Sequence, residues 1–410
     1  MNKKVAVIGL GYVGLPLALL FAKKNYTVIG LDIDVRKIEA LKQGKSYIPD
    51  VRNDVIQSEK NFQAYELQKG ISAFQVCDYV VVTVPTPITE NHNPDLGPVI
   101  SASTFLKEHM VKGQTVIYES STYPGTLEEV VLPILKESDL QAGVDFYLAY
   151  SPERVDPANK SYDIEYIPKV ISGYSKNCLY HVQMFYESIF QQVVPVSSPK
   201  VAEMCKLFEN IQRLVNISLV NETNELCEEL GIDFHEVLQA ASTKPFGFTP
   251  YYPGPGIGGH CIPVDPLYFL WKLKQNGLTS ELIEAAHHIN EEMPNKVIRR
   301  VEKQLAANEK RVFVVGVAYK KDVNDMRESP ALAVCEGLLA KGYELAYHDP
   351  YIDSAILNKQ TYFSVPLTKE EVEKSDVVLV LTDHSQIDWS IVRYAKKVVD
   401  TRGILNECSR

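Results

Sequence analysis

Short runs of consecutive apolar residues, many of them β-branched, recur through the first 150 residues of the chain. Each run has the length and composition of a buried parallel strand, in which both faces are covered and polar residues do not alternate with apolar ones. Helical spacing of apolar residues separates the first two runs, from Leu15 to Lys24. The pattern predicts an α/β domain with parallel strands at 4–8, 27–31, 78–84, 114–118 and 146–150.

A long helix is predicted next. Ser197, Ser198 and Pro199 form a capped start with proline in the first turn, and no proline or glycine follows from Lys200 to Leu230. At 1.5 Å per residue such a helix spans about 45 Å, enough to join two domains. Further helical patterns cover 234–241 and 280–308.

The buried-strand pattern then returns, at 311–316, 345–350, 377–384 and 397–402. The expected fold class is α/β, with two Rossmann-like doubly wound domains joined by the long central helix and a helical middle region. We expect the domain boundaries at 1–197, 198–300 and 301–410.

Composition narrows the class of protein. The 410 residues carry a formal net charge of -10, which argues against a nucleic-acid-binding surface. No apolar run reaches the roughly 20 residues of a membrane span, and the start of the chain does not resemble a signal peptide. The seven cysteines are scattered, with neither a CxxC pair nor a histidine cluster, so we expect no disulfide framework, no metal site and a reducing cytoplasm.

The first strand runs into Gly9, Gly11 and Gly14, and the second ends at Asp32, eighteen residues beyond Gly14. Strand, glycine turn, helix, strand and terminal acid in this order predict a dinucleotide site, with the pyrophosphate at the helix N-terminus. Asp32 would accept hydrogen bonds from the ribose hydroxyls and repel a 2′-phosphate. The cofactor is therefore expected to be NAD, although Asp34 and Arg36 blur the preference slightly.

Later strands of the same domain end in polar residues. These ends read Pro85-Thr86-Pro87, Glu119 to Thr126, and Ser151-Pro152-Glu153-Arg154. Carboxyl ends of parallel strands form one rim, so these residues are expected to line one site. A helix N-cap is the alternative for Ser120 and Thr122. On the long helix, Lys206, Asn210 and Arg213 share one face, which either turns towards this rim or is simply solvated.

Residues 253–265 read Pro-Gly-Pro-Gly-Ile-Gly-Gly-His-Cys-Ile-Pro-Val-Asp, with four glycines and three prolines. Such a stretch forms a shaped loop, because it suits neither a helix nor a regular strand. It places the Cys261 thiol four residues before Asp265, beside backbone that a ligand can approach closely. We interpret Cys261 as a candidate nucleophile; a tight turn with an incidental cysteine is the alternative. In the last domain, Lys320, Lys321 and Arg327 follow the first strand and suit a second polyphosphate, or else form a surface charge cluster.

Together these motifs resemble the UDP-glucose/GDP-mannose dehydrogenases, NAD-dependent four-electron oxidoreductases of nucleotide sugars. The matching stretches are GLGYVGLP (9–16), VPTP (84–87), ESSTYPGT (119–126), SPER (151–154), AEMCKLFEN (202–210), GPGIGGHCIPVDP (254–266) and AYKKDVNDMRESP (318–330). The resemblance implies an N-terminal NAD domain, a C-terminal UDP domain and a central dimer interface, so a homodimer is expected.

The resemblance also implies a mechanism. Cys261 would add to the C6 aldehyde, and the thiohemiacetal would be oxidised to a thioester and hydrolysed. The implied catalytic residues are Cys261, Lys206, Asp265, Glu153, Thr122 and Asn210. The implied cofactor contacts are Gly9, Gly11, Tyr12, Val13, Gly14, Asp32, Arg36, Pro85, Thr86, Ser121, Thr122 and Arg327. The implied substrate contacts are Glu153, Arg154, Lys206, Asn210, Arg213, Lys244, Phe246, Tyr251, Tyr252, Gly256, Gly258, Lys320 and Arg402.

The motifs around residues 151–157, 244–256 and 258–266 are most similar to those of UDP-N-acetylglucosamine 6-dehydrogenases. UDP-glucose enzymes tend to have a basic residue where this chain has Val264. UDP-glucose, UDP-GalNAc and UDP-ManNAc stay open as substrates. A two-electron hydroxyacid-type dehydrogenase and a catalytically silent nucleotide-sugar sensor are the competing functions.

Overall fold

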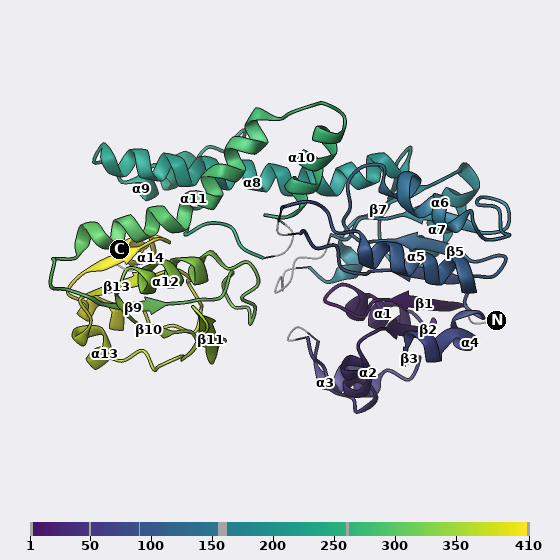
Figure 1. Ribbon diagram of the computed structural model, residues 1–410, viewed down its shortest axis with the longest axis horizontal. Coiled ribbons are helices and arrows are strands. Elements are labelled where there is room, and N and C mark those ends of the chain that lie inside the picture. Colours follow the sequence, from purple (N-terminus) through teal and green to yellow (C-terminus); the bar gives the residue numbers. More distant parts are fainter. Residues whose placement is uncertain (1–2, 49–50, 90, 155–161, 260–261, 408–410) are drawn as a thin grey trace. The chain divides into compact units, whose positions relative to one another are not determined.

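The computed structural model describes residues 3–48, 51–89, 91–154, 162–259 and 262–407. Contacts divide the chain into two compact units, residues 1–209 with 267–278, and residues 210–266 with 279–410. The division falls within one helix, α8 (Pro199–Glu229), which contributes to both units (Figure 1). Its start and length agree with the predicted long helix. None of the described helices is both long enough and apolar enough to cross a membrane.

The first unit is built on an eight-stranded sheet in the order β3-β2-β1-β4-β5-β6-β7-β8. All neighbouring strands run parallel except β6 and β7. The strands are β1 (Lys4–Ile8), β2 (Thr27–Asp32), β3 (Phe62–Glu66), β4 (Tyr79–Val82), β5 (Thr115–Tyr118), β6 (Tyr147–Tyr150), β7 (Lys169–Gly173) and β8 (Val193–Pro195). The change of direction at β1, which lies between β2 and β4, is the switch point where open parallel sheets bind ligands.

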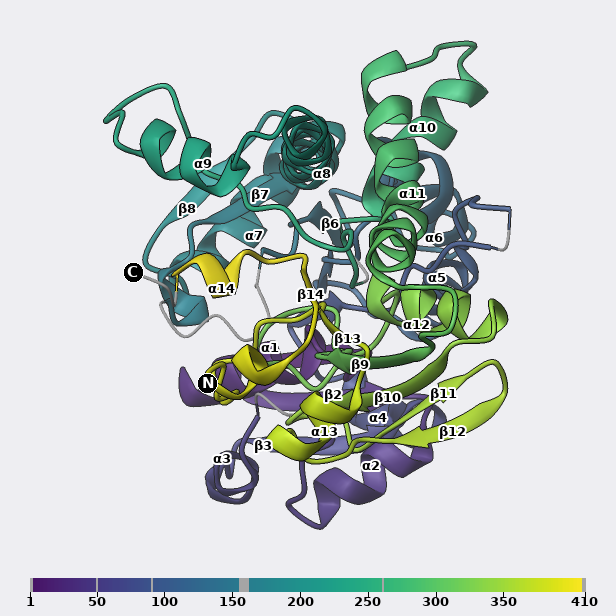
Figure 2. The ribbon, with the colours of Figure 1, turned by 90° about the vertical axis from the view of Figure 1, so that its left-hand side faces the viewer.

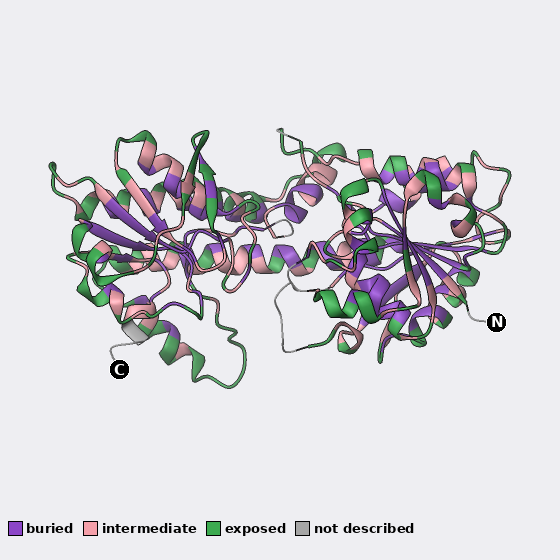
Figure 3. Cartoon of the chain, turned by 90° about the horizontal axis from the view of Figure 1, so that it is seen from below, coloured by how far each residue is buried: buried purple, intermediate pink, exposed green. Residues whose placement is uncertain are grey.

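Both faces of this sheet are covered, because successive residues of each strand point to opposite sides. Val5 and Val7 pack with helices α1, α2 and α7, whereas Ala6 and Ile8 pack with α4, α5, η2 and α6. Figure 3, in which buried residues are purple, shows the strands of this sheet as mostly buried. The helical segments are α1 (Gly14–Lys23), α2 (Val35–Lys42), α3 (Asn53–Ser58), η1 (Leu67–Gly70), α4 (Ile71–Phe74), α5 (Gly97–His109), η2 (Leu127–Val131), α6 (Leu132–Leu135), η3 (Ile164–Tyr166) and α7 (Lys176–Glu187).

The second unit contains a smaller parallel sheet in the order β10-β9-β13-β14. Its strands are β9 (Arg311–Val315), β10 (Glu344–His348), β13 (Val377–Val380) and β14 (Val398–Asp400), with a separate hairpin of β11 (Ser354–Leu357) and β12 (Gln360–Phe363). Phe313 and Val315 pack on α13 (Lys369–Lys374) and η4 (Ile391–Tyr394), while α12 (Pro330–Ala340) packs on β10. The remaining helices are α9 (Phe234–Ser242), α10 (Asp265–Gln275), α11 (Glu281–Gln304) and α14 (Ile404–Glu407), and Figure 2 views α8 along its axis.

The α/β fold class with two doubly wound sheets is therefore confirmed. The division into three domains at 197 and 300 stays a prediction.

Candidate functional site

The glycine turn after β1 has the geometry that a dinucleotide requires. Gly9 has φ +94°, and a Cβ there would lie 2.9 Å from the carbonyl oxygen of Thr83. A Cβ on Gly14 would lie 1.8 Å from the carbonyl oxygen of Gly9, so helix α1 can begin this close to the strand only with glycine. Gly11, in contrast, has no atom of the described residues within 4 Å of its Cβ position. The turn is closed on the protein side and open where a pyrophosphate would approach the helix N-terminus.

The acid at the end of β2 is held by this turn. Asp32 is buried, and its Oδ2 accepts hydrogen bonds from Leu10 N (2.8 Å) and Lys37 Nζ (3.1 Å). Arg36 pairs instead with Asp34 (2.9 Å) and is almost fully exposed. The Tyr47 hydroxyl donates to the carbonyl oxygen of Leu10 (2.6 Å) and covers the turn from the side. This site fits NAD, because the backbone N–H groups of the turn, the uncrowded Gly11 and the acid expected to bind the ribose, Asp32, lie at the ends of the neighbouring strands β1 and β2.

The other predicted cofactor residues of the first unit lie at neighbouring strand ends. Thr86 and Thr122 are buried, whereas Pro85 is exposed and Ser121 is half-buried. The alternative that Ser120 caps a helix is wrong: its hydroxyl donates to the carbonyl oxygen of Val84 (2.7 Å), and helical structure begins only at Leu127. Tyr12 and Val13 occupy the glycine turn itself.

A buried lysine and carboxylate come together in the first unit. Lys206 Nζ on α8 lies 3.7 Å from Glu153 Oε2, and both side chains are less than a tenth exposed. The neighbouring Arg154 pairs with Glu209 of α8 (2.7 Å) and donates to the carbonyl oxygen of Pro168 (2.8 Å). A lysine beside a carboxylate in a closed site can hold a proton or polarise an oxygen, as general acid–base chemistry requires.

A second buried ion pair, which sequence reasoning missed, supports this strand end. Lys169 Nζ lies 2.6 Å from Glu119 Oε2, and the Tyr186 hydroxyl donates to the same carboxylate. Lys169 also donates to the carbonyl oxygen of Pro152 (3.4 Å), next to Glu153. Burial raises the pKa of Glu119, while Lys169 and Tyr186 oppose that rise. The available signal was a charged residue at each of two buried positions, Glu119 directly after β5 and Lys169 at the start of β7, but the two positions are fifty residues apart in the chain.

Glu203 was also missed, although it lies in the quoted 202–210 motif. Its carboxylate accepts hydrogen bonds from Gly125 N (2.5 Å) and Leu127 N (2.9 Å), and so ties the Thr122 loop to α8. Burial is the main reason that the pKa of Glu203 is raised to about 7.

Three predicted polar residues meet in the second unit. Asn210 Nδ2 donates to Asp265 Oδ2, and Arg213 donates to Asn210 Oδ1. Asn210 and Asp265 are buried. Asp265 is the first residue of α10, a helix that the sequence analysis did not predict.

The described part of the glycine-rich loop is fixed by side chains of the second unit. Asn221 of α8 accepts from Gly254 N (2.9 Å), and Asn290 of α11 accepts from Ile257 N (2.7 Å). A Cβ on Gly254 would lie 2.6 Å from Arg402 Nη1, and one on Gly258 would lie 2.6 Å from the carbonyl oxygen of Glu328. Glycine is required at position 258, where the neighbouring atom belongs to the backbone, whereas the Arg402 side chain beside Gly254 can move. Cys261 lies outside the described residues.

The remaining predicted substrate residues are spread over the second unit. Lys244 and Phe246 are exposed, with the ammonium group 5.4 Å from the ring centre, and Tyr252 is exposed. Tyr251 donates to Gln212 Oε1 (2.9 Å). Arg327, which was predicted as a cofactor contact, forms an ion pair with Asp325 (2.7 Å). Gly256 and Lys320 are half-buried.

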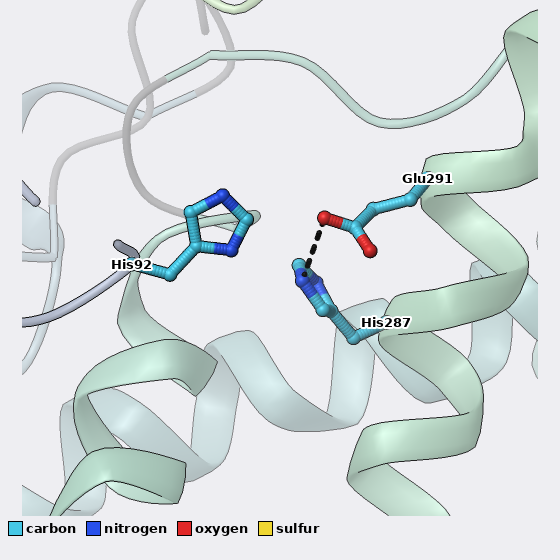
Figure 4. Close-up of side chains that lie close together, drawn as sticks. All are labelled: His92, His287 and Glu291. Carbon is cyan, nitrogen blue, oxygen red and sulfur yellow. Dashed lines mark ion pairs between the residues drawn. The ribbon is translucent and has the colours of Figure 1, made fainter. Parts of the chain in front are cut away.

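One further ionisable pair lies on α11. His287 Nε2 and Glu291 Oε1 are 3.1 Å apart, one helical turn from each other (Figure 4). Within the second unit this is an ordinary helix ion pair and does not by itself make a metal site. The expectation of no metal stays a prediction.

Family models for three successive domains match the chain. They describe the NAD binding domain of the UDP-glucose/GDP-mannose dehydrogenase family at residues 3–191, its central domain at 200–292 and its UDP binding domain at 313–407. The chain is similar to the UDP-N-acetyl-D-glucosamine 6-dehydrogenase of Pseudomonas aeruginosa, with 37% identity over 93% of this chain and 91% of the relative.

Solved structures agree with this result. The UDP-D-ManNAc dehydrogenase of Pyrococcus horikoshii superposes with a TM-score of 0.87 at 30% identity, covering 98% of this chain and 96% of the other. A UDP-glucose dehydrogenase of Pyrobaculum islandicum superposes with a TM-score of 0.86 at 26% identity, covering 98% and 94%. With all three domain models matched in order, the chain belongs to the UDP-glucose/GDP-mannose dehydrogenase family and carries its NAD-binding domain.

Proposed function

We propose that the chain oxidises the C6 hydroxyl of a UDP-sugar to a carboxylate with NAD, and that the sugar is UDP-N-acetylglucosamine. The observation that carries the proposal is the buried Lys206–Glu153 pair at the strand ends of the NAD-binding unit. The choice of sugar is supported by the Pseudomonas aeruginosa relative, which is named for that activity.

NAD would be held by the glycine turn and Asp32, and two NAD molecules used in succession would supply the hydride acceptor, one for each of the two oxidations of C6. Within the chain, Lys206 and Asp265 hold the base or water that takes the hydroxyl proton in the first oxidation. Asn210 and Lys206 donate hydrogen bonds to the oxyanion that develops on the C6 oxygen. Arg327 stays a predicted cofactor contact.

Cys261 supplies the covalent step. Its thiolate forms a bond to C6 of the aldehyde, because an aldehyde donates hydride poorly until a nucleophile makes it tetrahedral. A free thiol is only a few per cent ionised at pH 7, so the reaction needs a cation that stabilises the thiolate. We assign this role to Lys206, which would raise the ionised fraction of Cys261. After the second oxidation, water attacks the thioester, the C–S bond breaks, and thiol and carboxylate are released. Glu153 or Asp265 takes the water proton and Thr122 orients the water.

Three other substrates and two other functions compete with this proposal. UDP-ManNAc and UDP-glucose are supported by the names of the structural relatives, and UDP-GalNAc stays open. A two-electron hydroxyacid-type dehydrogenase would leave Cys261 as a structural residue. A nucleotide-sugar sensor would bind the substrate without turnover.

The test is a panel of the four UDP-sugars with NAD, followed by absorbance at 340 nm. We expect UDP-N-acetylglucosamine to give the highest kcat/KM and two NADH per sugar. One NADH per sugar would support the two-electron reaction, and no NADH with any sugar would support the sensor. Cys261→Ala is expected to abolish uronate formation, and Cys261→Ser to trap an acyl or hemiacetal species detectable by mass spectrometry. Full turnover by the alanine variant contradicts the covalent mechanism.

We also propose a homodimer formed through the central helices. A groove of about 470 Å³ lies between α8, α9 and the 247–251 loop and is lined by Leu219, Val237 and Phe248. All three side chains are exposed in the single chain, and apolar patches of this kind mark interaction surfaces.

A further inference from the structure

The turn after β1 provides the reference for a second turn in the chain. In the first unit, Gly9 N donates to the carbonyl oxygen of Leu31 (2.8 Å), which joins the end of β1 to the end of β2. The next backbone N–H, that of Leu10, donates to Asp32 Oδ2 (2.8 Å). A strand-end acid thus holds a glycine turn in place.

The second unit repeats this arrangement after β9. Gly316 N donates to the carbonyl oxygen of His348 (2.8 Å), which joins the end of β9 to the end of β10. Asp349 Oδ2 then accepts from Val317 N (2.7 Å) and Ala318 N (3.0 Å). Asp349 therefore corresponds to Asp32. Its Oδ2 accepts hydrogen bonds from two backbone N–H groups of the turn, whereas Asp32 Oδ2 accepts from one.

His384 is the feature that the first turn lacks. Its Nε2 lies 3.1 Å from Asp349 Oδ2, and its Nδ1 accepts from Asp322 N (2.9 Å). An Nδ1 that accepts carries no proton, so the neutral ring holds its proton on Nε2 and donates it to Asp349. Both the imidazole and the Asp349 side chain are fully buried. The ring therefore links the strand-end acid to the far end of the turn.

Asp322 needs such a link, because its backbone is in the left-handed region with φ +59°. That conformation costs free energy for a residue other than glycine and persists only when neighbours enforce it. Its carboxylate accepts from Ser385 N (2.8 Å) and Ser385 Oγ (2.7 Å), the residue directly after His384. The end of the turn is therefore held at both its backbone and its side chain.

The start of the same turn is held as firmly. Thr382 Oγ1 donates to the carbonyl oxygen of Ala318 (2.6 Å), and Ser329 Oγ donates to that of Val317 (2.9 Å). Tyr319 N donates to the carbonyl oxygen of Asp325 (3.1 Å). Lys320 thus stands between two fixed points of the backbone.

We propose that Asp349, His384 and Asp322 are positioning residues that fix the Lys320 turn and thereby set the affinity of the second unit for the diphosphate of UDP. The inference rests on the proposed function, because it takes Lys320 as a substrate contact. A lysine is a flexible point charge, so binding a phosphate costs ordering entropy unless its backbone is already fixed. The acid that would bind a ribose in a dinucleotide site is used here to hold the turn.

Two substitutions at His384 distinguish a role in positioning the Lys320 turn from a role in which the ring only fills space in the core. Asparagine places its amide oxygen near the position of Nδ1 and keeps an acceptor for Asp322 N. Glutamine places its amide nitrogen near the position of Nε2, keeps the donor to Asp349 and loses the acceptor. In calorimetric titrations of the full chain with UDP, we expect the Kd of His384→Gln to rise about tenfold and that of His384→Asn to stay within about threefold of wild type. Equal Kd values for the two variants, whether near wild type or weakened, overturn the proposal.

Three further variants complete the test. His348→Gln is the matched control, because the His348 Nδ1 contacts the carbonyl oxygen of Val365 (2.9 Å) rather than the turn, and UDP affinity should not change. Ser385→Ala, at an exposed position, removes one bond to Asp322 without opening the core and should weaken UDP binding by about threefold, which keeps the test valid if a His384 variant does not fold. Unchanged UDP affinity in Ser385→Ala counts against the proposal.

Lys320→Ala separates this inference from the proposed function. If Lys320→Ala binds UDP as wild type does, the assigned substrate contact is wrong, and the positioning proposal falls with it. If Lys320→Ala loses UDP binding while His384→Gln keeps it, only the positioning proposal is wrong. NAD affinity, titrated separately, should not change in any of these variants.

Discussion

At the scale of single residues, the least expected feature is the buried carboxylate of Glu203. This residue lies on α8, and its carboxylate accepts hydrogen bonds from the backbone at the start of η2. Two backbone donors compensate for part of its charge, yet burial dominates and raises its pKa to about 7 from 4.5. A buried carboxyl with this pKa links protonation to the stability of the loop that carries Thr122.

The sign of the pH dependence follows from the direction of that shift. Between pH 4.5 and about 7 the native state keeps a proton on Glu203 that the unfolded chain has already released. The contribution of Glu203 to the free energy of unfolding is therefore largest below pH 4.5 and decreases, by about 3 kcal/mol in total, as the pH rises to about 7.

Glu203→Gln removes this titration, so the free energy of unfolding of wild type, measured relative to that of the variant, should fall by that amount across the same pH range. Trp271 packs on Tyr123 of the loop, with ring centres 5.0 Å apart, and reports local unfolding by fluorescence once the other tryptophan is replaced by Trp389→Phe. Urea unfolding at a series of pH values measures the effect. Glu137→Gln, at an exposed position, is the control, and parallel curves for wild type and Glu203→Gln would show that Glu203 does not titrate in this range.

At the scale of elements, the strand–turn–helix unit β1–α1 separates folding from binding. Gly14 is closely surrounded by other residues, whereas the Cβ position of Gly11 meets no atom in the part of the chain that the structure describes. The two glycines of one motif therefore serve different ends, tight packing in the first case and close ligand approach in the second.

Gly11→Ala is expected to leave the melting temperature within about 2 °C of wild type, because its Cβ meets no atom among the residues with a described structure. The Kd for NAD should rise at least about tenfold, because the methyl group occupies the approach of the pyrophosphate. Gly14→Ala should instead destabilise the first unit. Calorimetry and NAD titration measure both effects, and unchanged NAD affinity in Gly11→Ala would show that the cofactor does not approach at this turn.

Elements with long apolar runs could be predicted from the sequence, and those defined by their neighbours could not. Strands β1, β2, β4, β5 and β6 follow from buried runs, and α8 follows from caps and the absence of helix breakers. Strand β7 was missed because it begins with Lys169, a charge that only its partner Glu119 explains. Strands β8, β11 and β12 were missed because few of their residues are buried, so that their sequences contain no continuous buried apolar run.

The same distinction, between features with a local sequence signal and features defined by distant neighbours, applies to the candidate site. Glycines and the strand-end acid could be predicted, because each has a local signature of spacing and position. The residues that hold them could not, since Asp322 and His384 are 62 positions apart and Gly125 and Glu203 are 78 apart. A hydrogen bond between distant chain positions leaves no periodic signal in one sequence.

At the scale of the whole molecule, α8 is the element on which the proposals converge. It contributes Lys206 to the first unit, Asn210 and Asn221 to the second, and exposed apolar residues to the groove with α9. An assembly that covers this groove would bury surface on the same helix that carries the candidate catalytic residues, so dimer formation would stabilise their shared support.

The last prediction concerns that assembly. Leu219 is 55% exposed and lines the groove, and a charge there cannot be buried in a dimer interface without a large desolvation cost. Wild type is expected to elute in light-scattering chromatography with twice the chain mass of 46.1 kDa, and Leu219→Glu as the monomer. Ile356→Glu, on the exposed face of the β11–β12 hairpin, is the control and should stay dimeric. A Leu219→Glu dimer would place the interface elsewhere, whereas a wild-type monomer would reject the homodimer altogether.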